Sequence, residues 1–279
     1  MTPAEAAEAI IEDLGITQIA DLDVEAIAFD AGVEVVYESL SGCEATLVGV
    51  GDQAIATINP SEYRGRERFS VAHEIGHWKL HRGRSFRCRV DQIEENFGST
   101  VNFEKEADTF ASHLLMPSRM FNEAIRPFSR PNFKQLGEVA AAFDTSLTAT
   151  ALRLVGVDTL PTILACYTRS GLRWQAAAKH IPRRWYLKDQ VDEDSFAYDL
   201  LFSAKECRTL GKQSADTWFT NDDAGRYEVL EQCVPLRGSE VLVLLYLADS
   251  KMLYAGFDSG VGNRKYTEYG SYVAPRFKR

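Results

Sequence analysis

The feature that most constrains this chain is a pair of histidines set four residues apart around a glutamate, in His73-Glu-Ile-Gly-His77. The surrounding run, from Phe69 to Trp78, is largely apolar and has no proline, so it predicts a helix that continues through the motif. Residues four apart share one face of a helix, so both imidazoles can bind one metal ion. Glu74 can reach a catalytic water but not easily the metal. This arrangement is typical of a zinc peptidase.

The alternative is a surface helix that carries two solvated histidines. The sequence has only 5 histidines, and two of them flank a glutamate in an apolar stretch, which favours the metal site. A catalytic zinc site uses three protein ligands, so a third ligand is needed. His81 follows His77 by one helical turn, but it lies about 12 Å from His73 along a continuous helix, too far to share the ion. We expect His81 to end the helix, where the dipole favours it.

The third ligand is predicted further along the chain, in residues 103–117. Apolar residues recur there at helical spacing: Phe103, Ala107, Phe110, Ala111 and Leu114. Glu104 and Asp108 share the face beside this stripe, whereas Glu106 points nearly to the opposite side. The pattern selects Glu104 as a metal ligand and Asp108 as the acceptor that orients an imidazole N–H. The alternative is a solvated first turn of acids that favour the helix dipole, and the HExxH motif decides against it.

Two blocks, Arg68–His81 and Glu104–Pro117, together resemble the ImmA/IrrE metallopeptidases. The family pattern FxxAHExGHxxxH, followed by ExxA(N/D)xFAxxLLMP, is nearly complete in them. Carried over to this chain, the resemblance implies that Glu74 is the catalytic base. It also implies that the metal ligands are His73, His77 and Glu104. Zn²⁺ suits two histidines and a carboxylate, and Mn²⁺ is an alternative for the same ligands.

The resemblance also implies an α+β fold in three parts. These are a zincin-like metallopeptidase domain over 1–128, a helix-turn-helix-like helical segment over 129–158, and a C-terminal α/β sensor-like domain, GAF-like in fold, over 159–279. The implied function is cleavage of an XRE-type helix-turn-helix repressor, which switches on a stress or mobile-element response. The alternative is a metal-stabilised regulator that binds and displaces a repressor or antitoxin without cleaving it.

Composition restricts the location and partners of the protein. The 279 residues carry a net charge of −9, which does not favour nucleic acid. The first residues are acidic and unlike a signal peptide, and the longest apolar runs are too short for a membrane span. The 5 cysteines are scattered and include no CxxC, as in reduced proteins. We therefore expect a cytoplasmic protein.

Arginines surround the metal helix, and Arg82, Arg84 and Arg87 follow it directly. One interpretation is a solvated loop that balances the acidic remainder of the chain. The other is a basic rim that steers an acidic substrate segment toward the site. The donor that stabilises the oxyanion is left open among Tyr63, His81 and an arginine of this rim.

Periodicity and turn residues place further elements along the chain. Before the metal helix (residues 64–80) we expect helices at 3–14 and 22–31 and strands at 33–37, 45–50 and 54–58. A sheet edge beside the metal helix suits an extended substrate. Residues 82–101 are expected to form a loop, and helices are expected at 103–115 and 118–125.

Residues 133–143 and 147–155 outline a helix, a turn and a helix. The second helix has one basic residue, Arg153, and no Asn, Gln or Lys to contact bases, so we expect packing and consider direct DNA binding unlikely. Beyond residue 158 we expect strands at 162–167, 241–247 and 253–257, with a helix at 193–201.

Overall fold

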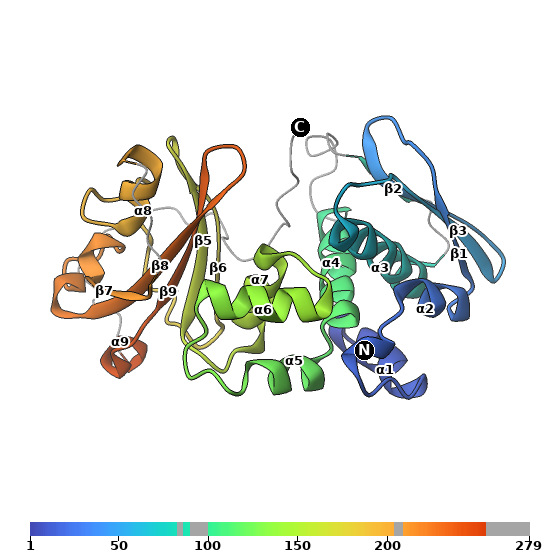
Figure 1. Cartoon of the computed structure of the whole chain (residues 1–279), viewed down its shortest axis with the longest axis horizontal. Coiled ribbons are helices and arrows are strands. Elements are labelled where there is room, and N and C mark those ends of the chain that lie inside the picture. The colour runs from blue at the N-terminus through green and yellow to red at the C-terminus, as the bar shows by residue number, and fades with distance from the viewer. Residues whose placement is uncertain (83–85, 90–99, 204–208, 255–279) are drawn as a thin grey trace. The chain divides into compact units, whose positions relative to one another are not determined.

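The computed structural model describes residues 1–82, 86–89, 100–203 and 209–254 (Figure 1). These residues fall into two compact units, one made of 1–127 with 138–149, the other of 128–137 with 150–254. No helix in these ranges is both long and apolar enough to cross a membrane. The boundary passes through α6 (Phe133–Phe143) and α7 (Leu147–Val157), which residues 144–146 connect. The predicted boundaries at residues 128 and 158 stay predictions.

The first unit combines helices with a four-stranded sheet of order β1-β3-β2-β4. Its strands are β1 (Val33–Tyr37), β2 (Cys43–Val50), β3 (Gln53–Ile58) and β4 (Phe86–Arg89). Its helices are α1 (Pro3–Asp13), α2 (Val24–Asp30), α3 (Arg64–Leu80), α4 (Thr100–Leu115) and α5 (Ser118–Ile125), with a 3-10 turn at Ile19–Asp21. β1 is parallel to β3, whereas β2 is antiparallel to both β3 and β4. The sheet is therefore mixed.

Local chemistry explains where several of these elements begin and end. Thr2 and Glu5 form a capping box at the start of α1, and Asp23 accepts backbone N–H groups at the start of α2. Gly32 then turns the chain into β1 with φ +79, and a Cβ on this residue would lie 2.8 Å from the Asp52 carbonyl oxygen. Only glycine meets both conditions without strain.

Helix α3 packs on the sheet and on α4, as Figure 1 shows. Every residue from Val71 to Trp78 is buried, which excludes the alternative of a surface helix with solvated histidines. Trp78 fixes α3 to the sheet: its indole Nε1–H donates to the Ala31 carbonyl at 2.9 Å, and its ring packs against Gly49 of β2. The metal motif therefore lies in the core of this unit.

The second unit is built on a five-stranded sheet of order β6-β5-β9-β8-β7, in which every pairing is antiparallel. Its strands are β5 (Thr162–Thr168), β6 (Gly171–Ala177), β7 (Gly211–Ser214), β8 (Glu228–Leu236) and β9 (Glu240–Tyr246). Its short helices are α8 (Phe196–Tyr198), a π-helical turn (Asp199–Ser203), α9 (Ser250–Tyr254) and 3-10 turns at Ala215–Thr217 and Ala224–Arg226. The central strands β5 and β9 are almost wholly buried.

The structure corrects several predictions. β4 lies inside the predicted loop 82–101, and strands β6, β7 and β8 were not predicted. The predicted strand 253–257 begins in helix α9 instead, and its residues 255–257 lie outside the described residues. Because every strand pairing in its sheet is antiparallel, the second unit is an antiparallel α+β arrangement and not the predicted α/β arrangement. Its GAF-like character stays a prediction.

Candidate metal centre

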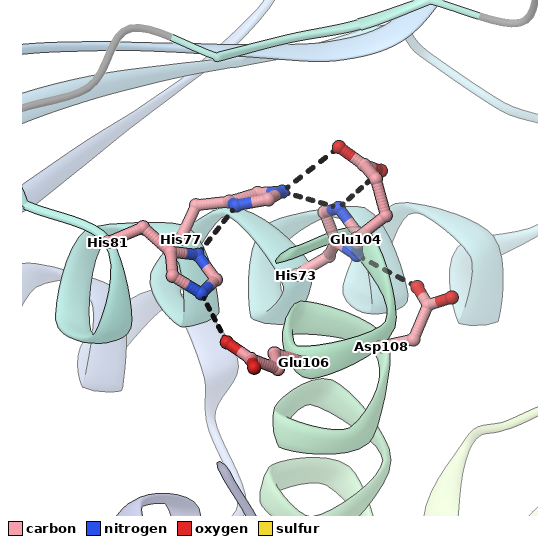
Figure 2. A network of polar contacts seen from close by, with 6 residues as sticks. All are labelled: His73, His77, His81, Glu104, Glu106 and Asp108. Atoms are coloured by element: carbon pink, nitrogen blue, oxygen red, sulfur yellow. Dashed lines mark hydrogen bonds and ion pairs between the residues drawn. The ribbon is translucent and has the colours of Figure 1, made fainter. Parts of the chain in front are cut away.

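Two imidazoles of α3 converge on one point. His73 and His77 lie one helical turn apart, and their Nε2 atoms are 3.0 Å from each other (Figure 2). His77 is fully buried, and His73 is nearly so. Two imidazole nitrogens at this separation, facing the same point, form half of a tetrahedral metal site.

Helix α4 brings a carboxylate to the same point. The Glu104 oxygens lie 3.5 Å from His73 Nε2 and 3.5 Å from His77 Nε2, and all three ligand atoms lie within 4.8 Å of one another. Two nitrogens and one carboxylate oxygen are the donor set of catalytic zinc sites. The residues present therefore fit a divalent metal ion, and the pattern that selected Glu104 agrees with its placement.

A glycine makes this convergence feasible. α3 and α4 lie close together at Gly76, where a Cβ would lie 3.1 Å from Phe110 Cδ1 and 3.2 Å from Ala107 Cα. Gly76 immediately precedes His77, and Ala107 is one turn past Glu104. The absence of a side chain at residue 76 lets α4 approach far enough for its carboxylate to reach the imidazoles.

The electrostatics of the site favour the ligand forms of these groups. Burial lowers the pKa of His77 below its ordinary value of 6.5, although Glu104 opposes the shift. Burial would raise the pKa of Glu104, but hydrogen bonds and charges from His73 and His77 outweigh it and hold the pKa well below 4.5. A neutral imidazole and an ionised carboxylate are the forms that bind metals.

Each imidazole also has a partner on its outer nitrogen (Figure 2). His73 Nδ1 lies 2.9 Å from Asp108 Oδ1, the contact expected of an orienting acceptor. His77 Nδ1 lies 3.1 Å from His81 Nδ1, and His81 Nε2 lies 2.9 Å from Glu106 Oε2. Glu106 was predicted to lie on nearly the opposite side of its helix from Glu104 and Asp108, and it contacts His81 instead of the three metal ligands.

The other predicted site residues lie as follows. Glu74 is fully buried on α3. Arg82 is exposed and already engaged: it pairs with Asp52 at 3.0 Å and stacks 4.6 Å above the Trp78 ring. Arg84 lies outside the described residues, as does the side chain of Arg87. The steering role of these arginines therefore stays a prediction.

Two of the oxyanion candidates are poorly placed. Tyr63 precedes α3, about 15 Å along the axis from His73 at ~1.5 Å per residue. Both ring nitrogens of His81 already have protein partners, and its backbone ends α3, as expected, with its N–H bonded to the His77 carbonyl. An arginine of the rim is the candidate that these contacts leave open.

The α6–α7 segment shows packing chemistry at its turn. Phe143 is buried, and Asp144 follows it with φ 51 and accepts a 3.1 Å ion pair from Arg64 of α3. Arg153, the basic residue of the second helix, is also buried. These side chains are engaged within the protein, which supports packing over base contacts.

The model of the IrrE N-terminal-like domain family (Peptidase_M78) matches residues 28–155, which supports the predicted resemblance to the ImmA/IrrE family for this part of the chain. No curated protein matches the chain. A solved structure titled "Mycobacterium tuberculosis transcriptional regulator" is similar in fold, with a TM-score of 0.58 and 14% identity over 88% of this chain and 76% of that chain.

Sequence reasoning missed two contributors to the site. The contact of Glu106 with His81 was not predicted. The spacing of four residues between His77 and His81 did indicate that both lie on one face of the helix. Gly76 was also missed. A glycine inside a helical pattern often marks a close approach of another backbone, and that signal was available.

Proposed function

We propose that this chain is a metal-dependent endopeptidase that cleaves a helix-turn-helix transcriptional repressor, with His73, His77 and Glu104 holding the metal. The convergence of these three side chains beside a buried glutamate carries the proposal. A bound zinc ion would polarise the scissile carbonyl and lower the pKa of a water toward neutrality. The match of residues 28–155 to the Peptidase_M78 family supports this reaction.

The chain's own residues would carry the proton. Glu74 follows His73 on α3, and its carboxylate is the base that would take a proton from the attacking water and deliver it to the leaving amine nitrogen. Asp108 would hold the His73 ring so that its Nε2 lone pair faces the site. The burial of Glu74 would keep bulk water from competing for this proton.

The substrate and setting extend the proposal. We take the substrate to be an XRE-type repressor and the setting to be a cytoplasmic stress or mobile-element response, with the second unit acting as a GAF-like sensor. The fold similarity to a protein titled a transcriptional regulator suits a regulatory role. The acidic net charge and the buried Arg153 favour a protein substrate over DNA.

The test is incubation of the purified protein, with zinc or manganese, with each helix-turn-helix repressor encoded near its gene, followed by mass spectrometry of the products. We expect one discrete cut, which Glu74→Gln abolishes while retaining bound metal. Glu67→Gln is the matched control, since this α3 glutamate accepts a hydrogen bond from the Ser61 N–H through an oxygen that glutamine also has. Cleavage retained in Glu74→Gln would refute the mechanism.

The second candidate is capture of the repressor without cleavage. Both candidates need the same metal ligands, and they differ in what Glu74 does. Association with the repressor and derepression that survive in Glu74→Gln, with no cut by the wild type under either metal, would favour capture.

A further inference from the structure

A line of polar contacts leads from His77 away from the metal ligands. His77 Nδ1 lies 3.1 Å from His81 Nδ1, His81 Nε2 lies 2.9 Å from Glu106 Oε2, and Asn102 Nδ2 donates to the other Glu106 oxygen at 3.0 Å. Figure 2 shows the line from His77 through His81 to Glu106, on the side opposite Asp108. None of these residues is one of the three metal ligands.

The donor direction along this line follows from chemistry. A carboxylate only accepts hydrogen bonds, so His81 presents its Nε2–H to Glu106. In its neutral form His81 has one N–H, so its Nδ1 is then an acceptor, and the proton between the two rings belongs to His77 Nδ1. We assign the tautomers from this network. The lone pair of His77 therefore lies on Nε2, the atom that faces His73 and Glu104.

The contacts around His81 hold it firmly in this role. Its side chain is only 3% exposed, and the Phe103 ring packs edge-on against it at 4.7 Å between centroids. Its backbone N–H donates to the His77 carbonyl at 2.9 Å, which fixes the end of α3. A ring confined on this many sides cannot easily turn away from His77.

We propose that His81 and Glu106 are positioning residues that fix the tautomer and the ring orientation of His77 as a metal ligand. Asp108 has the corresponding place at His73, so each imidazole has its own outer acceptor. His81 and Glu106 act only through His77 and do not contact the substrate. This inference rests on the proposed metal site.

The first test compares His81→Leu with His81→Asn. These side chains are nearly the same size, but only asparagine keeps an acceptor close to the position of Nδ1. We measure zinc affinity by competition with a chelator. His81→Leu should bind zinc about 10–100-fold more weakly, the usual effect of removing an outer partner, and His81→Asn should stay close to the wild type. His113→Leu, which removes another partly buried histidine of the same unit, should bind zinc like the wild type.

The second test observes the hydrogen bond itself. In the zinc-loaded wild type, nitrogen–nitrogen scalar coupling in nuclear magnetic resonance spectra should connect His77 Nδ1 with His81 Nδ1, with the proton on His77. Equal zinc affinities of the leucine and asparagine variants, or a proton on His77 Nε2, would overturn the inference. If His81→Leu does not fold, Glu106→Leu and Glu106→Gln form the substitute pair. Glu106→Leu should lose less zinc affinity than is expected for His81→Leu, and Glu106→Gln should lose none.

Failure of the inference is distinguishable from failure of the proposed function. Zinc binding that His73→Ala abolishes and His81→Leu leaves unchanged would overturn only the positioning role. A wild type that binds no zinc would overturn the proposed metal site, and this inference with it.

Discussion

Gly76→Ala tests whether the α3–α4 crossing sets the geometry of the metal centre. A Cβ at this position would meet Phe110 Cδ1 at 3.1 Å, Ala107 Cα at 3.2 Å and the Ala107 carbonyl oxygen at 3.3 Å. Two of these atoms belong to the backbone of α4 and cannot rotate away. α4 must therefore move by a few tenths of an ångström, and Glu104 lies one turn from the contact.

Two opposing terms give the expected change in the free energy of unfolding. Replacing a glycine inside a helix with alanine stabilises it by about 1 kcal/mol. Inserting a methyl group into a packed contact costs about 1–3 kcal/mol. If the two contributions add independently, Gly76→Ala lowers the free energy of unfolding by between zero and about 2 kcal/mol. Metal–ligand distances tolerate shifts of only about 0.2 Å. We therefore expect zinc affinity to fall by about tenfold, the lower end of the range seen when residues that support metal ligands are changed.

Gly137→Ala is the matched control for the first of these terms. Gly137 lies inside α6, and a Cβ there would have nothing within 4 Å. It should gain about 1 kcal/mol from helix propensity alone. We would measure urea unfolding by circular dichroism and zinc binding by chelator competition for both variants. An equal gain of stability in both, with unchanged zinc affinity in Gly76→Ala, would refute the reasoning.

Three further predictions concern the supports of the same unit. Gly49→Ala would place a Cβ 2.5 Å from the buried Trp78 ring, so the free energy of unfolding should fall by about 1–3 kcal/mol. Urea denaturation followed by tryptophan fluorescence measures this change. In Glu8, hydrogen bonds from His113 and Ser118 outweigh burial and lower the pKa below 4.5. Its stabilisation is therefore present above pH 4.5 and lost as pH falls through the lowered value, and the stability difference between wild type and Glu8→Gln should shrink on acidification. Asp144→Asn should lose about 1 kcal/mol or less, since the nearer of its two arginine partners, Arg64, is 77% exposed and the better-buried Arg68 lies 3.9 Å away. Asp144→Ala should lose about 1–2 kcal/mol more, because residue 144 has φ 51; thermal unfolding measures both changes.

The sequence predicted the parts of the site that depend on one helix at a time. His73 and His77 needed only the helical repeat, and Glu104 and Asp108 needed only a second repeat beside an apolar stripe. The contact between His81 and Glu106 depends on where α4 crosses α3, and periodicity within either helix carries no information about that crossing.

In the second unit, buried polar groups concealed strands from the sequence pattern. β8 was missed because Glu231 and Gln232 interrupt its apolar residues, although both are buried. Glu231 accepts hydrogen bonds from Trp218 Nε1 at 3.0 Å and from the Ala197 backbone at 3.0 Å, which compensates for its burial. α9 replaced a predicted strand because Asp249 accepts the Lys251 N–H and starts a helical turn. Both outcomes depend on hydrogen bonds that hydrophobic periodicity does not detect.

The number of ligands argues for cleavage over capture. A structural zinc site is closed by four protein ligands, whereas a catalytic site leaves one position for water. Among the described residues, the group that converges here has three members, His73, His77 and Glu104. Glu74, which follows His73 on the same helix, is fully buried. Since Glu74→Gln keeps the size and one oxygen of this side chain, its free energy of unfolding, measured beside that of the wild type, decides whether a loss of cleavage reflects lost chemistry or unfolding.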